Sequence, residues 1–148
     1  MAKDIPLSEI ILRKYERPYN IDKRQLVKKI CLSLGLLQPG DSRDVVVDVL
    51  MVLINEREKK VKLTSDEVKA KVEELRKSHN LELKGIAESN IRRQLKRLRD
   101  IMIIDKQNNL YYISEFEPLH TLFEQKIEKL LVQPSIERVK EYLKELEK

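Results

Sequence analysis

The stretch of sequence that decides the fold is residues 85–100, GIAESNIRRQLKRLRD. Within it Ile91, Leu95 and Leu98, followed by Met102, recur at the spacing of a single helical face. At about 100° per residue, the opposite face carries one serine and four basic side chains: Ser89, Arg92, Arg93, Lys96 and Arg97. The pattern predicts a helix over 88–100 with one face for an apolar core and the other for a negatively charged partner.

The residues that follow, 101–113 (IMIIDKQNNLYYI), alternate in polarity on both sides of Asn108-Asn109. Asparagine tolerates positive φ better than most residues, so this pair suits a tight type I′-like turn. A two-stranded hairpin is therefore expected directly after the basic helix. Tyr111 and Tyr112 are neighbours on a strand, so only one of them can face the core.

The first half of the chain predicts three helices. The first covers Leu7–Tyr15 and ends before Pro18, because proline disfavours helical geometry in the preceding residue. The second begins at Asp22, which has capping-box spacing with Gln25, and stops at Gly35. The third runs from about Ser42 to Glu58. Its valines also fit a strand, but the apolar stretch lasts for ten residues, which favours a helix in the core.

Between that helix and the basic one, residues 61–63 form a short extended segment. A fourth helix then begins at the capping box of Thr64 and Glu67 and ends near Asn80. After the hairpin, helical spacing returns over 117–132 and 135–147, on the two sides of Pro134. In the last stretch Ile136, Val139, Leu143 and Leu146 follow the a and d positions of a heptad.

Composition bounds the class of protein. The chain has 148 residues, of which 41% are apolar and 37% are charged, as expected for a folded domain with a charged surface. No apolar run could span a bilayer, and the N-terminus lacks the apolar core of a secretory signal, which together predict a cytoplasmic protein. The single cysteine, Cys31, lies in an apolar run and is expected to be buried.

The sequence gives no sign of an enzyme. It has no glycine-rich phosphate loop and no nucleophile–base arrangement, and His79 and His120 have no partners at metal-ligand spacing. We therefore expect no catalytic activity, no metal and no cofactor. Positive charge is concentrated on the helix–hairpin unit, because residues 84–113 carry seven basic and three acidic groups. Such a concentration is typical of a nucleic-acid contact.

The order of elements from 42 to 113 resembles the winged helix-turn-helix domain: helix, short strand, helix, turn, basic helix and two-stranded wing. Residues 86–100 carry the resemblance through a small polar helix start, an inward aliphatic residue and a Leu-x-x-Leu pair. The connection from His79 to Ala87 is longer than the turn of the simplest members. The whole sequence is also similar to an uncharacterised archaeal group of winged-helix proteins, and no function comes with that similarity.

The resemblance implies a mainly α (α+β) fold that binds double-stranded DNA, with helix 88–100 in the major groove, most simply as a transcriptional regulator. Base contacts would fall to Arg92 and Arg93, ahead of Ser89 and Asn90, and phosphate contacts to Lys96 and Arg97. The remaining candidates are two residues of the wing, Lys106 and Gln107. Arg99 is excluded as too near the buried side.

Other interpretations stay open. Arg92 and Arg99 could pair with acids of neighbouring helices, and Lys106 could serve solubility alone. A winged helix could also dock on a protein or an RNA within a larger complex. We expect three parts: an N-terminal helical extension (1–41), the winged domain (42–113) and C-terminal helices (114–148). The last part either pairs two copies into a homodimer or packs on its own N-terminal helices.

Overall fold

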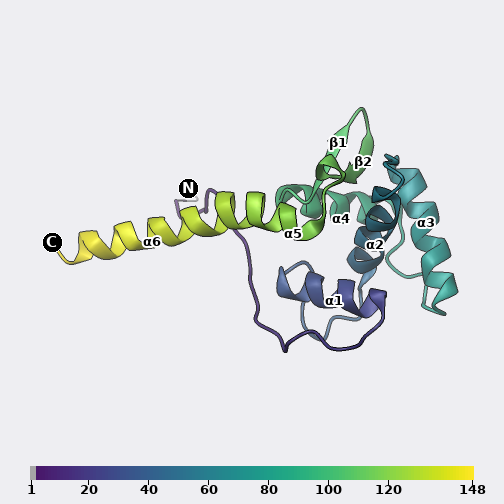
Figure 1. Cartoon of the computed structure of the whole chain (residues 1–148), viewed down its shortest axis with the longest axis horizontal. Helices are drawn as coiled ribbons and strands as arrows, with labels where there is room; N and C mark the ends of the chain where they lie inside the picture. The colour runs from purple at the N-terminus through teal and green to yellow at the C-terminus, as the bar shows by residue number, and fades with distance from the viewer. Residues whose placement is uncertain (1–2) are drawn as a thin grey trace.

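The structure is a computed structural model, and it describes residues 3–148. The protein is mainly helical, with one antiparallel two-stranded sheet (Figure 1). The elements in chain order are α1 (Lys23–Ser33), α2 (Val45–Arg57), α3 (Ser65–Ser78), α4 (Glu88–Asp100), β1 (Ile104–Gln107), β2 (Leu110–Ile113), the 3₁₀ turn η1 (Ser114–Phe116), α5 (Leu119–Leu122), the π-helical η2 (Phe123–Val132) and α6 (Gln133–Leu146).

Helix α2 lies at the centre of the core. Every residue from Val45 to Leu53 is buried, which confirms the helix preferred over a strand for this valine-rich run. It packs against α1, α3, α4 and β2. One continuous core joins Val27 of α1 to Ile127 of η2. Segments outside 42–113 therefore contribute to the same core as that range.

The helix expected over Leu7–Tyr15 is not formed, and the chain there is extended. Long-range contacts override its helical pattern. The Arg13 guanidinium donates to the carbonyls of Leu32 (3.0 Å), in the last turn of α1, and Leu37 (3.2 Å), beyond its end. The side chain of Ile11 lies over Gly35, where an added Cβ would come within 2.6 Å of the Ile11 Cβ. The N-terminal extension is thus helical only in α1, and its first two residues lie outside the described part.

The predicted helix ends and turns are mostly confirmed. Asp22 caps α1 by accepting from the Gln25 amide at 2.8 Å, and Thr64 and Glu67 form a complete capping box at α3. Gly35 follows α1 with φ +72°, a conformation that favours glycine. Asn108 and Asn109 both have positive φ, as a type I′-like turn requires.

The hairpin is shorter than expected, because α4 ends at Asp100 and residues 101–103 turn before β1 begins. Met102 has φ +65° and therefore lies outside the helix whose apolar face it was expected to extend. Tyr111 is buried and Tyr112 is not, as predicted for neighbouring strand residues. The backbone amide and carbonyl of Leu63 form hydrogen bonds with the carbonyl and amide of Tyr111. These bonds join the extended segment 61–63 to the sheet.

Pro134 does not divide the C-terminal helix. From Leu119 to Leu146 the helical elements follow one another without a break, and the last of them, α6, projects away from the body (Figure 1). Before the proline, η2 has π-helical hydrogen bonding, in which the Gln133 amide reaches the Glu128 carbonyl. A wider turn relieves the clash between a proline ring and the carbonyl four residues earlier. In the described residues 3–148, no helix has both the length and the apolar character needed to cross a membrane.

Candidate nucleic-acid interface

Helix α4 is anchored through one face. Ile91, Leu95 and Leu98 are completely buried, and α4 packs against α2, α3 and β1. Its start is fixed by Asn90, whose side-chain amide donates to the Gly85 carbonyl at 2.6 Å. The preceding connection is fixed by Arg76, whose Nε donates to the Glu82 carbonyl at 2.6 Å. Two side-chain contacts therefore set the direction in which α4 leaves the long connection from α3.

The opposite face of α4 is exposed and basic. Arg92, Arg93 and Lys96 all reach solvent. Arg92 pairs with Glu88 at 2.5 Å and Lys96 with Asp100 at 3.2 Å, each one helical turn away. Such exposed pairs contribute little to stability, so a polyanion can displace them at low cost. Within residues 3–148 Arg93 forms no ion pair, which leaves its guanidinium available.

The remaining candidates on α4 differ in availability. Ser89 is exposed at the start of the helix. Asn90 is half-buried and uses both ends of its amide, since its oxygen accepts from Gln94 at 3.1 Å. Arg97 is also half-buried and donates to Gln94 (2.8 Å) and to the Gly35 carbonyl (3.3 Å). Asn90 and Arg97 therefore hold α4 against its neighbours, whereas Ser89 lies free at the surface.

The two candidates outside α4 lie on the β1–β2 hairpin. Lys106 and Gln107 are exposed at the end of β1, before the Asn-Asn turn. The ammonium of Lys106 lies 5.5 Å from the centre of the Tyr111 ring. The side-chain oxygen of Gln107 accepts from Lys62 at 3.2 Å. Lys62 thus adds a further cation beside the hairpin that sequence reasoning did not include.

The surface is hollowed on both sides of the exposed face of α4. On the side of the β1–β2 hairpin, a hollow of about 620 Å³ is lined by Lys96, Arg99 and Lys106, with Asp100 and Asp105 as its acids. Arg99 is exposed here, so its exclusion as too near the buried side was wrong. The helix turns this residue toward the β1–β2 hairpin, where it lines the hollow.

On the other side, a hollow of about 580 Å³ contains four cations and one acid. Arg93 and Arg97 come from α4, Lys84 from the connection before it and Arg43 from the loop before α2. Arg43 and Lys84 are both highly exposed, and their only ion pairs among the described residues are to Asp41 (3.5 Å) and Glu82 (3.4 Å). Sequence reasoning missed Arg43 because only the fold brings residues 38–43 beside α4, and it missed Lys84 because this residue precedes the helix whose exposed face was considered.

A second charged group lies inside the protein, under the helices that support α4. Arg24 of α1 and Arg76 of α3 enclose Asp48 of α2, and both also contact Asp44 at its N-cap position. All four residues are buried, and the shortest of the four ion pairs joins Arg76 to Asp48 at 2.7 Å. Two cations and two anions balance, so this buried ionic cluster adds no net charge. It was not foreseen from the sequence.

The pKa values of Asp44 and Cys31 are shifted in opposite directions, although burial acts to raise both. Burial alone would raise the pKa of Asp44, but hydrogen bonds from Arg76 and Arg24 outweigh it and hold the pKa below its usual value. Burial raises the pKa of the Cys31 thiol to about 12, because it outweighs the opposing charges of Arg97 and Arg24. Cys31 is therefore a buried apolar side chain, as predicted. Residues 3–148 contain no group of three potential metal ligands.

Comparison with known proteins gives no match: no family model, no curated protein and no solved structure is similar enough to this chain to assign it to a family.

Proposed function

We propose that the protein binds double-stranded DNA in the manner of a winged helix, with α4 in the major groove and the β1–β2 hairpin as the wing. One observation carries the proposal: α4 exposes Arg92, Arg93 and Lys96 on the face opposite its buried residues, with further cations in the hollows on both sides. A single α-helix fits into a major groove, which is about 12 Å wide. Regulation of transcription in the cytoplasm is the simplest role for such a protein.

Roles within the interface follow from availability. Arg93 is the first candidate for reading a base, because a guanidinium without an ion pair can form two parallel bonds to guanine. Arg92 and Lys96 can exchange their present ion pairs for contacts with bases or phosphates, because each of those pairs is exposed. Arg43, Lys84, Arg99 and Lys106 are placed to contact phosphates on either side of the groove.

Salt-dependent binding to a random-sequence DNA duplex tests the proposal. The logarithm of the affinity is expected to fall linearly with the logarithm of salt concentration, because bound cations release counterions from DNA. Arg93→Ala should weaken binding and reduce the slope by about one. Arg138→Ala, which removes an exposed arginine from α6, is the matched control and should change neither quantity.

Two results would count against DNA as the ligand. Absence of binding to the duplex even at low salt would reject the proposal outright. Tighter binding to a structured RNA or an acidic protein than to DNA, with the same dependence on Arg93, would favour a docking module in a larger complex.

A homodimer through α6 is the second part of the proposal. None of the α6 residues is buried, and Ile136, Val139, Leu143 and Leu146 are 48–76% exposed. In 114–148, η2 shares the core with α1, whereas α6 has no buried residue and so leaves an apolar face for a second copy. A two-fold pair would present two copies of α4 to neighbouring half-sites.

Sedimentation tests this arrangement. Leu143→Glu should convert a dimer to a monomer, because it places a charge in the proposed seam. Glu141→Ala, on the other side of α6, should leave the dimer intact. A wild-type protein that stays monomeric at the highest measurable concentrations would refute the pairing without affecting the DNA-binding test.

A further inference from the structure

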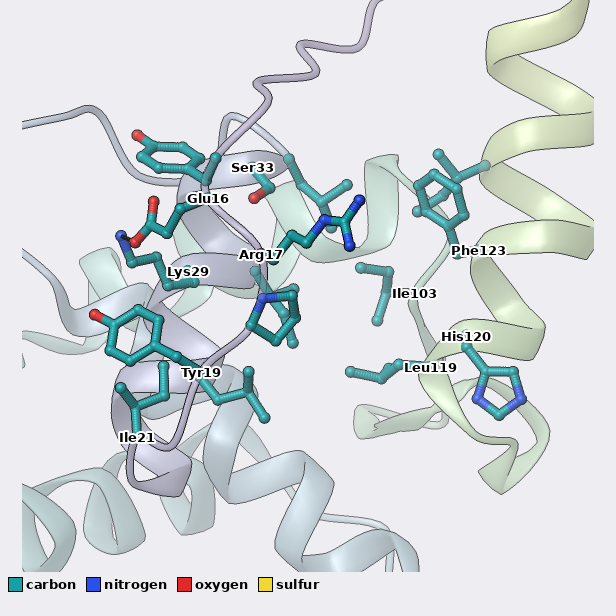
Figure 2. Close-up of a pocket in the computed structure, with 16 residues that line it drawn as sticks. Glu16, Arg17, Tyr19, Ile21, Lys29, Ser33, Ile103, Leu119, His120 and Phe123 are labelled. Atoms are coloured by element: carbon teal, nitrogen blue, oxygen red, sulfur yellow. Dashed lines mark ion pairs between the residues drawn. The ribbon is translucent and has the colours of Figure 1, made fainter.

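The protein contains a pocket that DNA binding does not use. It has a volume of about 390 Å³ and lies between the extended segment 15–21 and α1 on one side and α5–η2 on the other (Figure 2). This volume is within the range of small-molecule sites, roughly 300–1,000 Å³. Its inner wall is apolar and comes from three parts of the chain: Ile30 and Leu34, then Ile103, then Leu119, Phe123 and Ile127.

Only one charged side chain is directed across this pocket without a partner. The guanidinium of Arg17 extends toward Phe123 and Ile103 (Figure 2), and within residues 3–148 it forms no ion pair. The other two charges at the rim satisfy each other, since Lys29 pairs with Glu16 at 2.7 Å. His120 lies at the far edge with its ring turned outward.

We propose that this pocket binds a small organic acid with an apolar body, whose carboxylate pairs with Arg17 and whose body rests on Leu34, Ile103 and Phe123. An apolar wall with a single unpaired guanidinium favours an amphiphilic anion over a neutral or cationic ligand. Part of the wall is π-helical, in η2, and such irregular helices are frequent at functional sites. The inference does not depend on DNA binding.

Octanoate and 1-octanol are a matched pair of probes, because they share a chain length and differ in the charged head. Titration calorimetry should show that wild-type protein prefers octanoate. Arg17→Met retains much of the side-chain stem and is exposed, so the variant should fold. It should weaken octanoate binding by about tenfold or more, as expected for loss of a charge-assisted bond, and leave 1-octanol unchanged. Arg138→Met on α6 should bind both probes like the wild type.

Methyl NMR locates the bound probe. Octanoate should shift the methyl signals of Leu34, Ile103 and Leu119 before those of Ile136, Val139 and Leu143 on the exposed face of α6. Shifts confined to α6 would overturn the proposal, because they would mean that the acid coats the free helix. Equal affinity for the two probes, no effect of Arg17→Met, or no binding of octanoate at millimolar concentration would each overturn it as well.

Discussion

The buried ionic cluster and the exposed face of α4 use the same kinds of side chain for different ends. In the cluster, Arg24 and Arg76 each contact both aspartates, Asp44 and Asp48, and solvent scarcely reaches any of the four. On α4, Arg92 has a single exposed partner and Arg93 has none among the described residues. Burial demands balanced charge, whereas exposure allows an excess of one sign. An arginine's role in this protein is therefore decided by what surrounds it.

The largest effect should come from breaking the cluster. Asp48→Asn keeps the size of the side chain but leaves two buried arginines short of an anion. Breaking a buried ion pair in this way typically costs about 3–5 kcal/mol of unfolding free energy. Denaturant titration measures the loss. The matched change on α4, Asp100→Asn, should cost less than about 1 kcal/mol because its pair is exposed. Equal losses in the two variants would contradict the distinction.

The buried ionic cluster should also make the unfolding free energy depend on pH in the acid range, with a smaller effect than that of Asp48→Asn. The pKa of Asp44 is lower in the folded protein, so its contribution is fully present above the ordinary aspartate value of about 3.9 and is lost as pH falls through the lowered value. Unfolding free energy measured from pH 6 to pH 2 should therefore fall less steeply in Asp44→Asn than in the wild type.

Other carboxylates also steepen the acid profile, because Glu16 and Glu67 have lowered pKa values in the folded protein. The difference between wild type and Asp44→Asn removes their common contribution. Asp100→Asn serves again as the control and should follow the wild-type profile. Parallel profiles for Asp44→Asn and the wild type below pH 4 would show that the cluster does not lower this pKa.

The sequence predicted what depends on near neighbours. Three local features were predicted from the sequence: the helix cap at Asp22, the capping box at Thr64 and the turn at Asn108-Asn109. Each is formed by residues within a few positions of one another. The buried face of α4 was predicted from the helical spacing of its apolar residues. These features place the basic face of α4 in solvent, so the central part of the candidate site was accessible from sequence.

Features that depend on distant residues were not predicted. Arg13 makes contacts 19 and 24 positions away that oppose a helix over 7–15, and no local pattern signals them. Arg97 has the same local pattern as Arg93, yet the carbonyl of Gly35, 62 positions earlier, holds its guanidinium. The buried ionic cluster likewise joins three helices. Composition gives the charges, but only the packing of α1 and α3 on α2 decides which of them become internal.

A third effect should separate stability from binding on α4. Arg93→Ala removes an exposed side chain without an ion pair in the described structure, so unfolding free energy should stay within about 0.5 kcal/mol of the wild type. Arg97→Ala removes a hydrogen bond to Gln94 within α4 and one that joins α4 to the Gly35 carbonyl, and it should cost about 1 kcal/mol or more. Denaturant titration of both variants checks the contrast. A greater loss for Arg93→Ala would mean that it, too, has a structural partner.

The smallest effect tests whether the exposed pairs on α4 restrain its cations. Asp100→Asn removes the carboxylate that Lys96 contacts at 3.2 Å. This carboxylate is also one of the two acids that line the hollow beside the β1–β2 hairpin. If α4 meets DNA as proposed, the variant should bind a duplex a few-fold more tightly, because less negative charge opposes the phosphates. The gain should shrink as salt rises, since exposed charges about 10 Å apart are screened at 0.1 M. Fluorescence anisotropy at two salt concentrations measures it. Weaker binding would indicate that Asp100 orients Lys96 toward the DNA rather than restraining it. The ion pairs on the exposed face would then position their cations, as the ion pairs of the buried cluster do.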